Sequence, residues 1–545
     1  MFTSLHDFQP DMTQANLIWI DDWHVEGHHL RSFRLTTAHL YGAPVRTYGI
    51  FGVPATGQSS GKFPGILHIH GGGQTASLEN VLFNLRAGYA CLSFDWTGLK
   101  EGRNPQTVTE YPVEIEDIGN SFQALTTKQP QDTTVCLAFQ AAVTCLHMLA
   151  EQPEVDRERV GIYGISWGGF LTWLVNGTQT LQRCAIAIYG TGGMNRPNHI
   201  RHHHWNAATD QQRLAWGRLF EPLRYACTQK APIYHINGTD DFFGGFDIAA
   251  ELLSLTPTEY RCDYTPNCNH HFDTGSTLTA RQWMDHSLKD GPAVPSAPDV
   301  AITILDDSRV RITVRSSNAD QNHLTLHYSC GKVWHGARCW YSATNWDRED
   351  TTYVMDLPVN GQLWCTVQQL DPQTGATVSS LPLIVDMPKA ASTYDPLLYQ
   401  PGIRETGWGM QWRTELFDAG FEDLPWAFTG AGMEIGPKPT GSLLFMGLSA
   451  PEHQPPSGTA LVLELHGEGS LELQLEPRNP AYRGTPYITT IEPCNHEISL
   501  KPGDFVTAAG KPLSSWTDVA LLAIVRHEQE NGATCTLRRM FWQHD

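Results

Sequence analysis

One short segment, Val160–Gly169, constrains the fold of this chain more than any other. It is an apolar run that leads into Gly-Ile-Ser-Trp-Gly around Ser166, and a helix-like run follows it. Glycines two positions before and after a serine permit a sharp turn from a strand into a helix, where the backbones crowd. Such a turn exposes the serine hydroxyl at a helix N-terminus, whose partial positive charge favours a developing anion. The pattern predicts that Ser166 is a nucleophile held between a strand and a helix.

Strand-like and helix-like runs alternate along the first 290 residues. Helical spacing of apolar residues occurs in Gln140–Glu151 and Phe170–Asn176. Several other apolar runs are nearly continuous, as expected for strands that helices cover on both faces. These runs are Gly65–Ile69, Tyr89–Phe94, Val160–Gly164, Cys184–Tyr189 and Pro232–Ile236. The alternation predicts an α/β fold with a mostly parallel sheet over residues 1–290.

Two breaks separate this α/β part from two β-rich segments. The first, Asp290–Pro298, contains three prolines and a glycine, and the second lies at Met387–Pro396. Residues 299–387 show period-two alternation, for example in Arg309–Arg315, which predicts a small β-sandwich of the immunoglobulin or fibronectin type III kind. Residues 396–545 are also rich in strand-like runs and are predicted to form a jelly-roll β-sandwich. The strand-like runs of this last segment are Ser442–Leu448, Ala460–Leu465, Ser470–Leu475, Val519–Val525 and Thr534–Phe541.

The charge balance narrows the classes of partner. The chain has 37 Lys and Arg residues and 57 Asp and Glu residues, which gives a formal net charge of −20. This charge disfavours nucleic acid and anionic membrane surfaces as binding partners. No apolar stretch is long enough to span a membrane, and the N-terminus lacks the pattern of an export signal, so a cytoplasmic location is expected. The 12 cysteines include no closely spaced pair, which argues against a zinc site.

A second motif, His70-Gly-Gly-Gly, follows the apolar run Gly65–Ile69. Consecutive glycines let backbone N–H groups approach a substrate carbonyl because no Cβ atom intervenes. The N–H groups of Gly72 and Gly73, together with that of Trp167, are therefore candidate donors to an oxyanion. His70 itself is interpreted as a hydrogen-bonding residue that shapes this loop.

The two motifs together resemble the α/β-hydrolase superfamily. That resemblance implies a catalytic triad in the chain order nucleophile, acid, histidine, with Ser166 as the nucleophile. Asp241 follows Pro232–Ile236 in a Gly-x-x-Asp sequence and is the candidate acid, with Asp240 as the alternative. His270 is the candidate base, and the adjacent His271 is its alternative.

Local sequence around the motifs is similar to the dienelactone hydrolase and acetylxylan esterase-like branch of that superfamily. The similar stretches are His70–Gln74, Phe94–Gly98 and Ser166–Gly169, and the resemblance covers about residues 40–285. It implies a serine carboxylesterase that removes small acyl groups, acetyl in particular, from a carbohydrate, with no metal or organic cofactor. A peptidase or lactonase using the same triad is the alternative. Peptidases of the prolyl oligopeptidase type share Ser-Trp-Gly-Gly but carry a long N-terminal propeller.

A predicted cap between Tyr189 and Pro232 is the candidate substrate-binding region. Trp205 and Trp216 are candidates to stack on a sugar ring or aromatic acyl group, and Arg196 and Arg218 to meet a carboxylate. The alternative interpretation is that these four residues form the cap's own core and solvated rim.

The C-terminal segment resembles the jelly-roll modules of carbohydrate-active enzymes, which implies that it could bind a glycan. The alternative interpretation is that it has only a structural role and packs against the hydrolase part. A carbohydrate-binding protein with a vestigial hydrolase domain is the second functional hypothesis. The expected substrate is a small-molecule or oligosaccharide ester, and the oligomeric state is left open.

Overall fold

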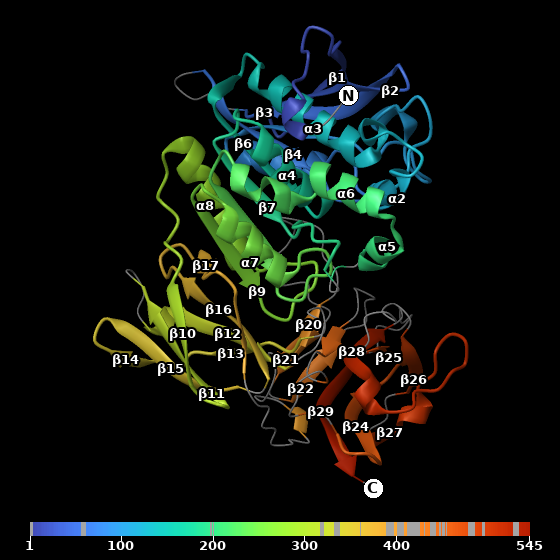
Figure 1. The fold of residues 1–545 in the computed structure, drawn as a ribbon, viewed down its shortest axis with the longest axis vertical. Coiled ribbons are helices and arrows are strands. Elements are labelled where there is room, and N and C mark those ends of the chain that lie inside the picture. Colours follow the sequence, from blue (N-terminus) through green and yellow to red (C-terminus); the bar gives the residue numbers. More distant parts are fainter. Residues whose placement is uncertain are drawn as a thin grey trace.

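A computed structural model gives the fold of the chain (Figure 1). It describes residues 4–55, 61–196, 199, 201–316, 321–331, 338–359, 361–387, 397–400, 408–410, 426–429, 431–435, 443–445, 448, 453, 455–477, 486–492, 496–526 and 534–544.

The N-terminal part is built on a twisted sheet in which six neighbouring strands are parallel. An antiparallel meander of β1 (Ile18–Val25), β2 (His28–Leu40) and β3 (Ala43–Val53) precedes them and was not predicted from the sequence. The parallel strands are β4 (Phe63–Ile69), β5 (Ala90–Phe94), β6 (Val155–Ile165), β7 (Cys184–Ile188), β8 (Ile233–Gly238) and β9 (Tyr260–Thr265). Their spatial order is β5-β4-β6-β7-β8-β9, with β3 antiparallel beside β5. This arrangement confirms the predicted α/β fold of the N-terminal part.

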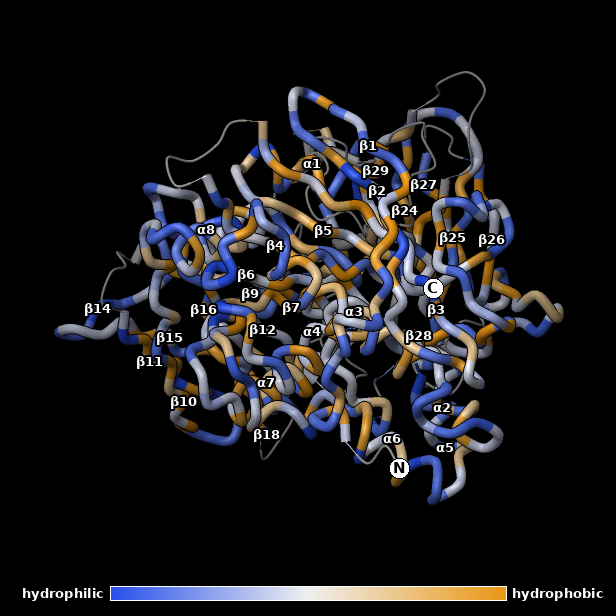
Figure 2. Tube along the Cα trace, turned by 90° about the horizontal axis from the view of Figure 1, so that it is seen from above, coloured by the Kyte–Doolittle hydropathy of each residue, from blue (hydrophilic) through white to orange (hydrophobic). Residues whose placement is uncertain are grey.

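Helices cover both faces of this sheet, so β4, β5, β7 and β8 are buried along their whole length. Figure 2 shows hydrophobic residues, in orange, mainly inside the molecule and hydrophilic residues, in blue, mainly at its outside. The helices are α1 (Leu78–Arg86), α2 (Ser121–Ala124), α3 (Thr134–Ala150), α4 (Trp167–Thr178), α5 (His202–Ala207), α6 (Asp210–Leu219), α7 (Phe246–Leu255) and α8 (Thr274–Lys289). Both α5 and α6 belong to the predicted cap between β7 and β8. No helix among the described residues is long and apolar enough to cross a membrane.

The sheet does not end at β9 but continues into the second segment. Strand β17 (Thr377–Ser379) pairs antiparallel with β9, and β16 (Gln362–Leu370), β12 (Leu324–Cys330) and β13 (Tyr341–Ala343) follow it in order. β18 (Leu383–Asp386) also pairs with β16. The described strands of this sheet number fourteen. The continuity was not predicted, because β9 and β17 lie far apart in the sequence.

A four-stranded sheet packs against this extension. It consists of β10 (Asp299–Asp306), β11 (Arg309–Arg315), β15 (Thr352–Pro358) and β14 (Asp347–Glu349). Inward-facing residues such as Val310 and Ile312 of β11 share a core with Leu324 and Leu326 of β12. Residues 290–298, the first predicted break, contain no helix or strand.

The C-terminal segment is β-rich and has a core of its own. One sheet contains β21 (Trp426–Thr429), β22 (Gly432–Ile435), β29 (Cys535–His544), β24 (Thr459–Gly467), β27 (His496–Leu500) and β19 (Leu397–Tyr399). The other contains β20 (Trp408–Met410), β23 (Leu443–Phe445), β28 (Val519–Arg526), β25 (Leu471–Pro477) and β26 (Tyr487–Ile491). These sheets are consistent with a β-sandwich, whereas the immunoglobulin-like and jelly-roll types stay predictions. Most of the second predicted break lies outside the described residues.

Candidate active site

Ser166 lies in a strained turn between β6 and α4. Its backbone has φ 57° and ψ −118°, a conformation that residues with a side chain rarely adopt. The turn is tight: a methyl group on Gly168 would lie 1.9 Å from the carbonyl oxygen of Ile69, and one on Gly164 would lie 2.2 Å from the carbonyl oxygen of Gly168. Gly164 and Gly168 are therefore required, because a side chain at either position would clash with a backbone carbonyl oxygen. The turn leaves Ser166 half-buried at the start of α4.

Asp241 and His270 form a hydrogen-bonded pair. His270 Nδ1 lies 2.8 Å from Asp241 Oδ2, and both side chains are buried. The other carboxylate oxygen of Asp241 accepts the backbone N–H groups of Phe243 and Gly244, each at 2.7 Å. The carboxylate is thus held in one orientation, with an oxygen directed at the imidazole ring.

The alternative candidates have different partners. Asp240 accepts the indole N–H of Trp340 at 3.1 Å and the hydroxyl of Thr239 at 3.1 Å. Burial raises the pKa of the Asp240 carboxyl well above its usual range. The backbone N–H of His271 donates to the carbonyl oxygen of Asn269 at 2.5 Å, and its ring lies 5.8 Å from that of Phe272.

Two aromatic rings hold the imidazole of His270. Phe242 stacks on it with the ring centroids 4.5 Å apart, and Tyr189 lies 4.4 Å away from it. Tyr189 directly follows Ile188, whose carbonyl oxygen accepts the backbone N–H of Ser166 at 2.8 Å. The end of β7 therefore contacts both the serine turn and the histidine ring.

The glycine run lies against the same turn. A methyl group on Gly71 would lie 3.2 Å from the Cβ atom of Ser166, and one on Gly72 would lie 2.7 Å from the Trp167 ring. The backbone N–H of Gly71 donates to the side chain of Gln74 at 2.7 Å. No acceptor within the described residues contacts the N–H groups of Gly72 and Gly73. The N–H of Trp167, in the first turn of α4, is a helix-terminal donor that needs a partner from outside the helix.

His70 has the loop-shaping contacts predicted for it. Its Nδ1 donates to the Gly71 carbonyl oxygen at 2.7 Å, and its Nε2 accepts the Trp96 N–H at 3.3 Å. The ring is also stacked on Trp96 with the centroids 4.8 Å apart. Burial lowers the pKa of His70 to about 4, so at neutral pH the ring is uncharged.

The four cap candidates lie in different environments. Trp216 is fully buried against Phe122 and Phe170, and its indole N–H donates to Glu221 at 3.2 Å, which leaves no exposed face to stack on a sugar. Trp205 is partly buried and stacks on Phe122 at 5.7 Å. Arg196 pairs with Glu251 of α7, and Arg218 is exposed on α6. Trp216 therefore belongs to the core of the cap, as in the alternative interpretation, whereas substrate contact by Trp205, Arg196 and Arg218 stays a prediction.

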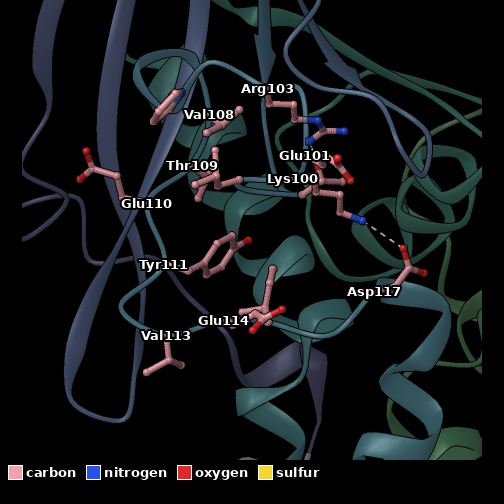
Figure 3. A pocket seen from close by; sticks show the side chains of 14 residues that line it. Lys100, Glu101, Arg103, Val108, Thr109, Glu110, Tyr111, Val113, Glu114 and Asp117 are labelled. Atoms are coloured by element: carbon pink, nitrogen blue, oxygen red, sulfur yellow. Dashed lines mark hydrogen bonds and ion pairs between the residues drawn. The ribbon is translucent and has the colours of Figure 1, made fainter.

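A cavity of about 1010 Å³ is lined by the segment that follows β5 (Figure 3). Its walls come from residues 97–117, and Arg103 in the wall donates to the carbonyl oxygens of Gly73 at 2.5 Å and Gln74 at 2.8 Å. Lys100 and Asp117 form an ion pair of 3.1 Å beside it. Sequence reasoning missed this cavity, because residues 97–117 have neither strand nor helix periodicity to place them.

Comparison with protein families gives two overlapping matches. Residues 12–191 match the acetyl xylan esterase family, and residues 121–282 match the prolyl oligopeptidase family. No curated protein sequence matches the chain.

Solved structures with a similar fold include acetyl xylan esterases and peptidases. Acetyl xylan esterase 1 from Thermoanaerobacterium sp. JW/SL YS485 is 16% identical, with 51% of this chain and 88% of that chain covered and a TM-score of 0.42. The enzyme from Paenibacillus sp. R4 is 14% identical, with coverages of 52% and 98% and a TM-score of 0.42. An acylaminoacyl peptidase from Pyrococcus horikoshii is 19% identical, with coverages of 49% and 40% and a TM-score of 0.34.

The sheet order and the two family matches identify the class of this protein: it is a serine hydrolase of α/β-hydrolase fold. Within that superfamily, residues 12–191 are similar to the acetyl xylan esterase family. Among the described residues there is no group of three or more His, Cys, Asp or Glu side chains that could hold a metal ion.

Proposed function

We propose that this protein is a carboxylesterase that removes small acyl groups, acetyl above all, from a carbohydrate. The observation that carries the proposal is the 2.8 Å hydrogen bond between His270 and Asp241 beside the strained turn of Ser166. These are the residue types that activate a serine hydroxyl, in the chain order of the α/β-hydrolases.

In the proposed reaction, Ser166 attacks the ester carbonyl and His270 accepts the hydroxyl proton. The alcohol leaves with that proton, and water then hydrolyses the acyl-enzyme. Asp241 fixes the ring so that Nε2 is the basic nitrogen. The N–H groups of Gly72, Gly73 and Trp167 stabilise the oxyanion, a contribution of about 3–4 kcal/mol for each donor that acts. This chemistry requires no cofactor.

The proposed acyl group is small, and the proposed alcohol is a sugar. The match of residues 12–191 to acetyl xylan esterases supports both assignments. Trp167 and Phe243, whose rings lie 4.6 Å apart next to Ser166 and Asp241, would limit the room for a long acyl chain. The alcohol part is assigned to the cavity beside the glycine run, because Arg103 joins the two.

The test compares wild-type protein with Ser166→Ala on p-nitrophenyl acetate and on acetylated xylo-oligosaccharides. The wild type should release acetate from both, and Ser166→Ala should lose at least about 10³-fold in kcat. Equal turnover by the two proteins would contradict the proposal. Turnover of aryl acetate alone would retain the esterase but reject the sugar substrate.

A peptidase is the second candidate, favoured by the match of residues 121–282 to the prolyl oligopeptidase family. Dipeptide p-nitroanilides and simple lactones assayed beside the acetyl esters separate the candidates. A kcat/KM higher for the anilides than for the acetyl esters would favour the peptidase.

A further inference from the structure

The loops that carry Asp241 and His270 are fastened to each other by backbone and side-chain hydrogen bonds. The Asp240 N–H donates to the Cys268 carbonyl oxygen at 2.9 Å, and the Phe242 N–H donates to the Asn269 side chain at 3.0 Å. The Asn267 N–H donates to the Thr239 hydroxyl at 3.0 Å. A displacement of one loop would therefore move the other loop as well.

Trp340, from the β-rich second segment, contacts both loops at once. Its indole N–H donates to Asp240 Oδ1 at 3.1 Å, one residue before Asp241. Its backbone N–H donates to the Asn267 side-chain oxygen at 2.8 Å, and its carbonyl oxygen accepts the Asn267 amide at 2.7 Å. Asn267 lies three residues before His270 and has φ 52°, so its side chain is presented from a left-handed turn.

The surroundings of Trp340 belong to the core of the N-terminal part. Trp340, Trp364 and Phe246 lie in the same hydrophobic cluster as the central sheet, and Phe246 is the first residue of α7. The Phe246 ring lies 4.8 Å from that of Trp340 and stacks on that of Trp364 at 5.7 Å. Trp340 is completely buried, so its position is set by packing as well as by its three hydrogen bonds.

We propose that Trp340 is a positioning residue, through which the second segment holds Asp241 and His270 at hydrogen-bonding distance from each other. This inference rests on the proposed esterase reaction and adds a residue outside the α/β part to its machinery. Trp340 itself does not touch substrate: it acts through Asp240 on one loop and through Asn267 on the other.

The test uses Trp340→Phe, which keeps an aromatic ring against Phe246 and removes the indole donor. The matched control is Trp346→Phe. Trp346 is also a buried tryptophan of the second segment, and its indole N–H donates to the Leu324 carbonyl oxygen at 2.9 Å, away from both loops. Both variants lose one buried hydrogen bond, so their thermal stabilities should fall by similar amounts.

Of these two variants, only Trp340→Phe should lower kcat. On p-nitrophenyl acetate its kcat should fall by roughly tenfold, the scale of one misplaced hydrogen bond, with KM changed by less than about twofold. The rate of Ser166 labelling by a fluorophosphonate should fall in parallel. Trp346→Phe should retain the wild-type kcat and labelling rate. Equal kcat in the two variants, or a change in KM alone, would overturn the inference.

A second variant, Asn267→Gly, covers the case in which Trp340→Phe does not fold. Glycine accepts the left-handed backbone and removes both side-chain hydrogen bonds to Trp340. Its kcat should also fall by roughly tenfold at unchanged KM, and a wild-type kcat would overturn the inference. Wild-type protein that neither hydrolyses the ester nor reacts with the probe would overturn the proposed function itself.

Discussion

At the scale of single residues, two adjacent carboxyl groups have separate partners. Asp241 is hydrogen-bonded to His270, and Asp240 is hydrogen-bonded to Trp340 and Thr239. Their order along the chain alone could not separate them, because only the tertiary contacts of each side chain distinguish one neighbour from the other. The same is true of His270 and His271.

Substitution of each aspartate by asparagine should therefore have unequal effects. Asp241→Asn should lower kcat by about 10³–10⁴-fold, because an amide favours the wrong tautomer of His270. Asp240→Asn should lower it by less than about tenfold, since the amide oxygen still accepts the Trp340 indole. Steady-state kinetics on p-nitrophenyl acetate measure both variants, and the reverse ranking would show that Asp240 is the acid.

Glu221 is a hydrogen-bonded carboxyl in the cap. It accepts the N–H of Gly193 at 2.8 Å and the indole N–H of Trp216, and burial raises its pKa to about 7. Because the folded protein binds this proton more tightly than the unfolded chain, the contribution of Glu221 to stability should fall as pH rises from about 4.5 to about 7. The loss should be complete above that range.

Glu221→Gln removes this titration. The difference in Tm between Glu221→Gln and wild type should become more positive from pH 5 to pH 8, by a few degrees. Calorimetry or dye-monitored melting across this range measures it. A difference independent of pH would mean that Glu221 does not titrate there.

At the scale of elements, the turn around Ser166 and the parallel strands could be predicted from the sequence, because local spacing and apolar runs determine them. The extension of the sheet through β17 could not, since it depends on polar contacts between distant segments. Asp263 of β9, completely buried, accepts the hydroxyls of Ser276, Thr377 and Ser379 and the Gln368 amide. One carboxyl group thereby joins β9 and α8 to β16 and β17.

Loss of that carboxyl group should weaken the joined sheet. Asp263→Ala should lower the free energy of unfolding by about 2–4 kcal/mol, because it leaves several buried donors without an acceptor. The control is Asp356→Ala, which removes an exposed carboxyl paired with Arg311 and should change stability little. Urea denaturation of both variants gives the comparison. Equal midpoints would show that the Asp263 cluster does not stabilise the fold.

At the scale of the whole molecule, the second segment shares a sheet and a core with the α/β part, whereas the C-terminal segment has its own sheets and core. A chain cut at residue 290 would expose the edge of β9 and lose Trp340 and Trp364 from the core. The sequence predicted a boundary there from the prolines, which mark irregular backbone but say nothing about contacts across it.

Two truncated forms of the chain should therefore differ in solubility and activity. Residues 1–387 should remain soluble and keep kcat/KM for p-nitrophenyl acetate within about threefold of the full chain. Residues 1–290 should be insoluble or inactive. An active, soluble protein of residues 1–290 would show that the shared sheet is dispensable.

The proposed reaction depends on Ser166 as the nucleophile, activated by His270 and Asp241. It is tested most directly by brief labelling with a fluorophosphonate and mass spectrometry of the tryptic peptides. One adduct is expected, on Ser166, which forms far more slowly in His270→Ala and is absent in Ser166→Ala. An adduct on another residue, or no adduct on a protein that hydrolyses p-nitrophenyl acetate, would contradict it.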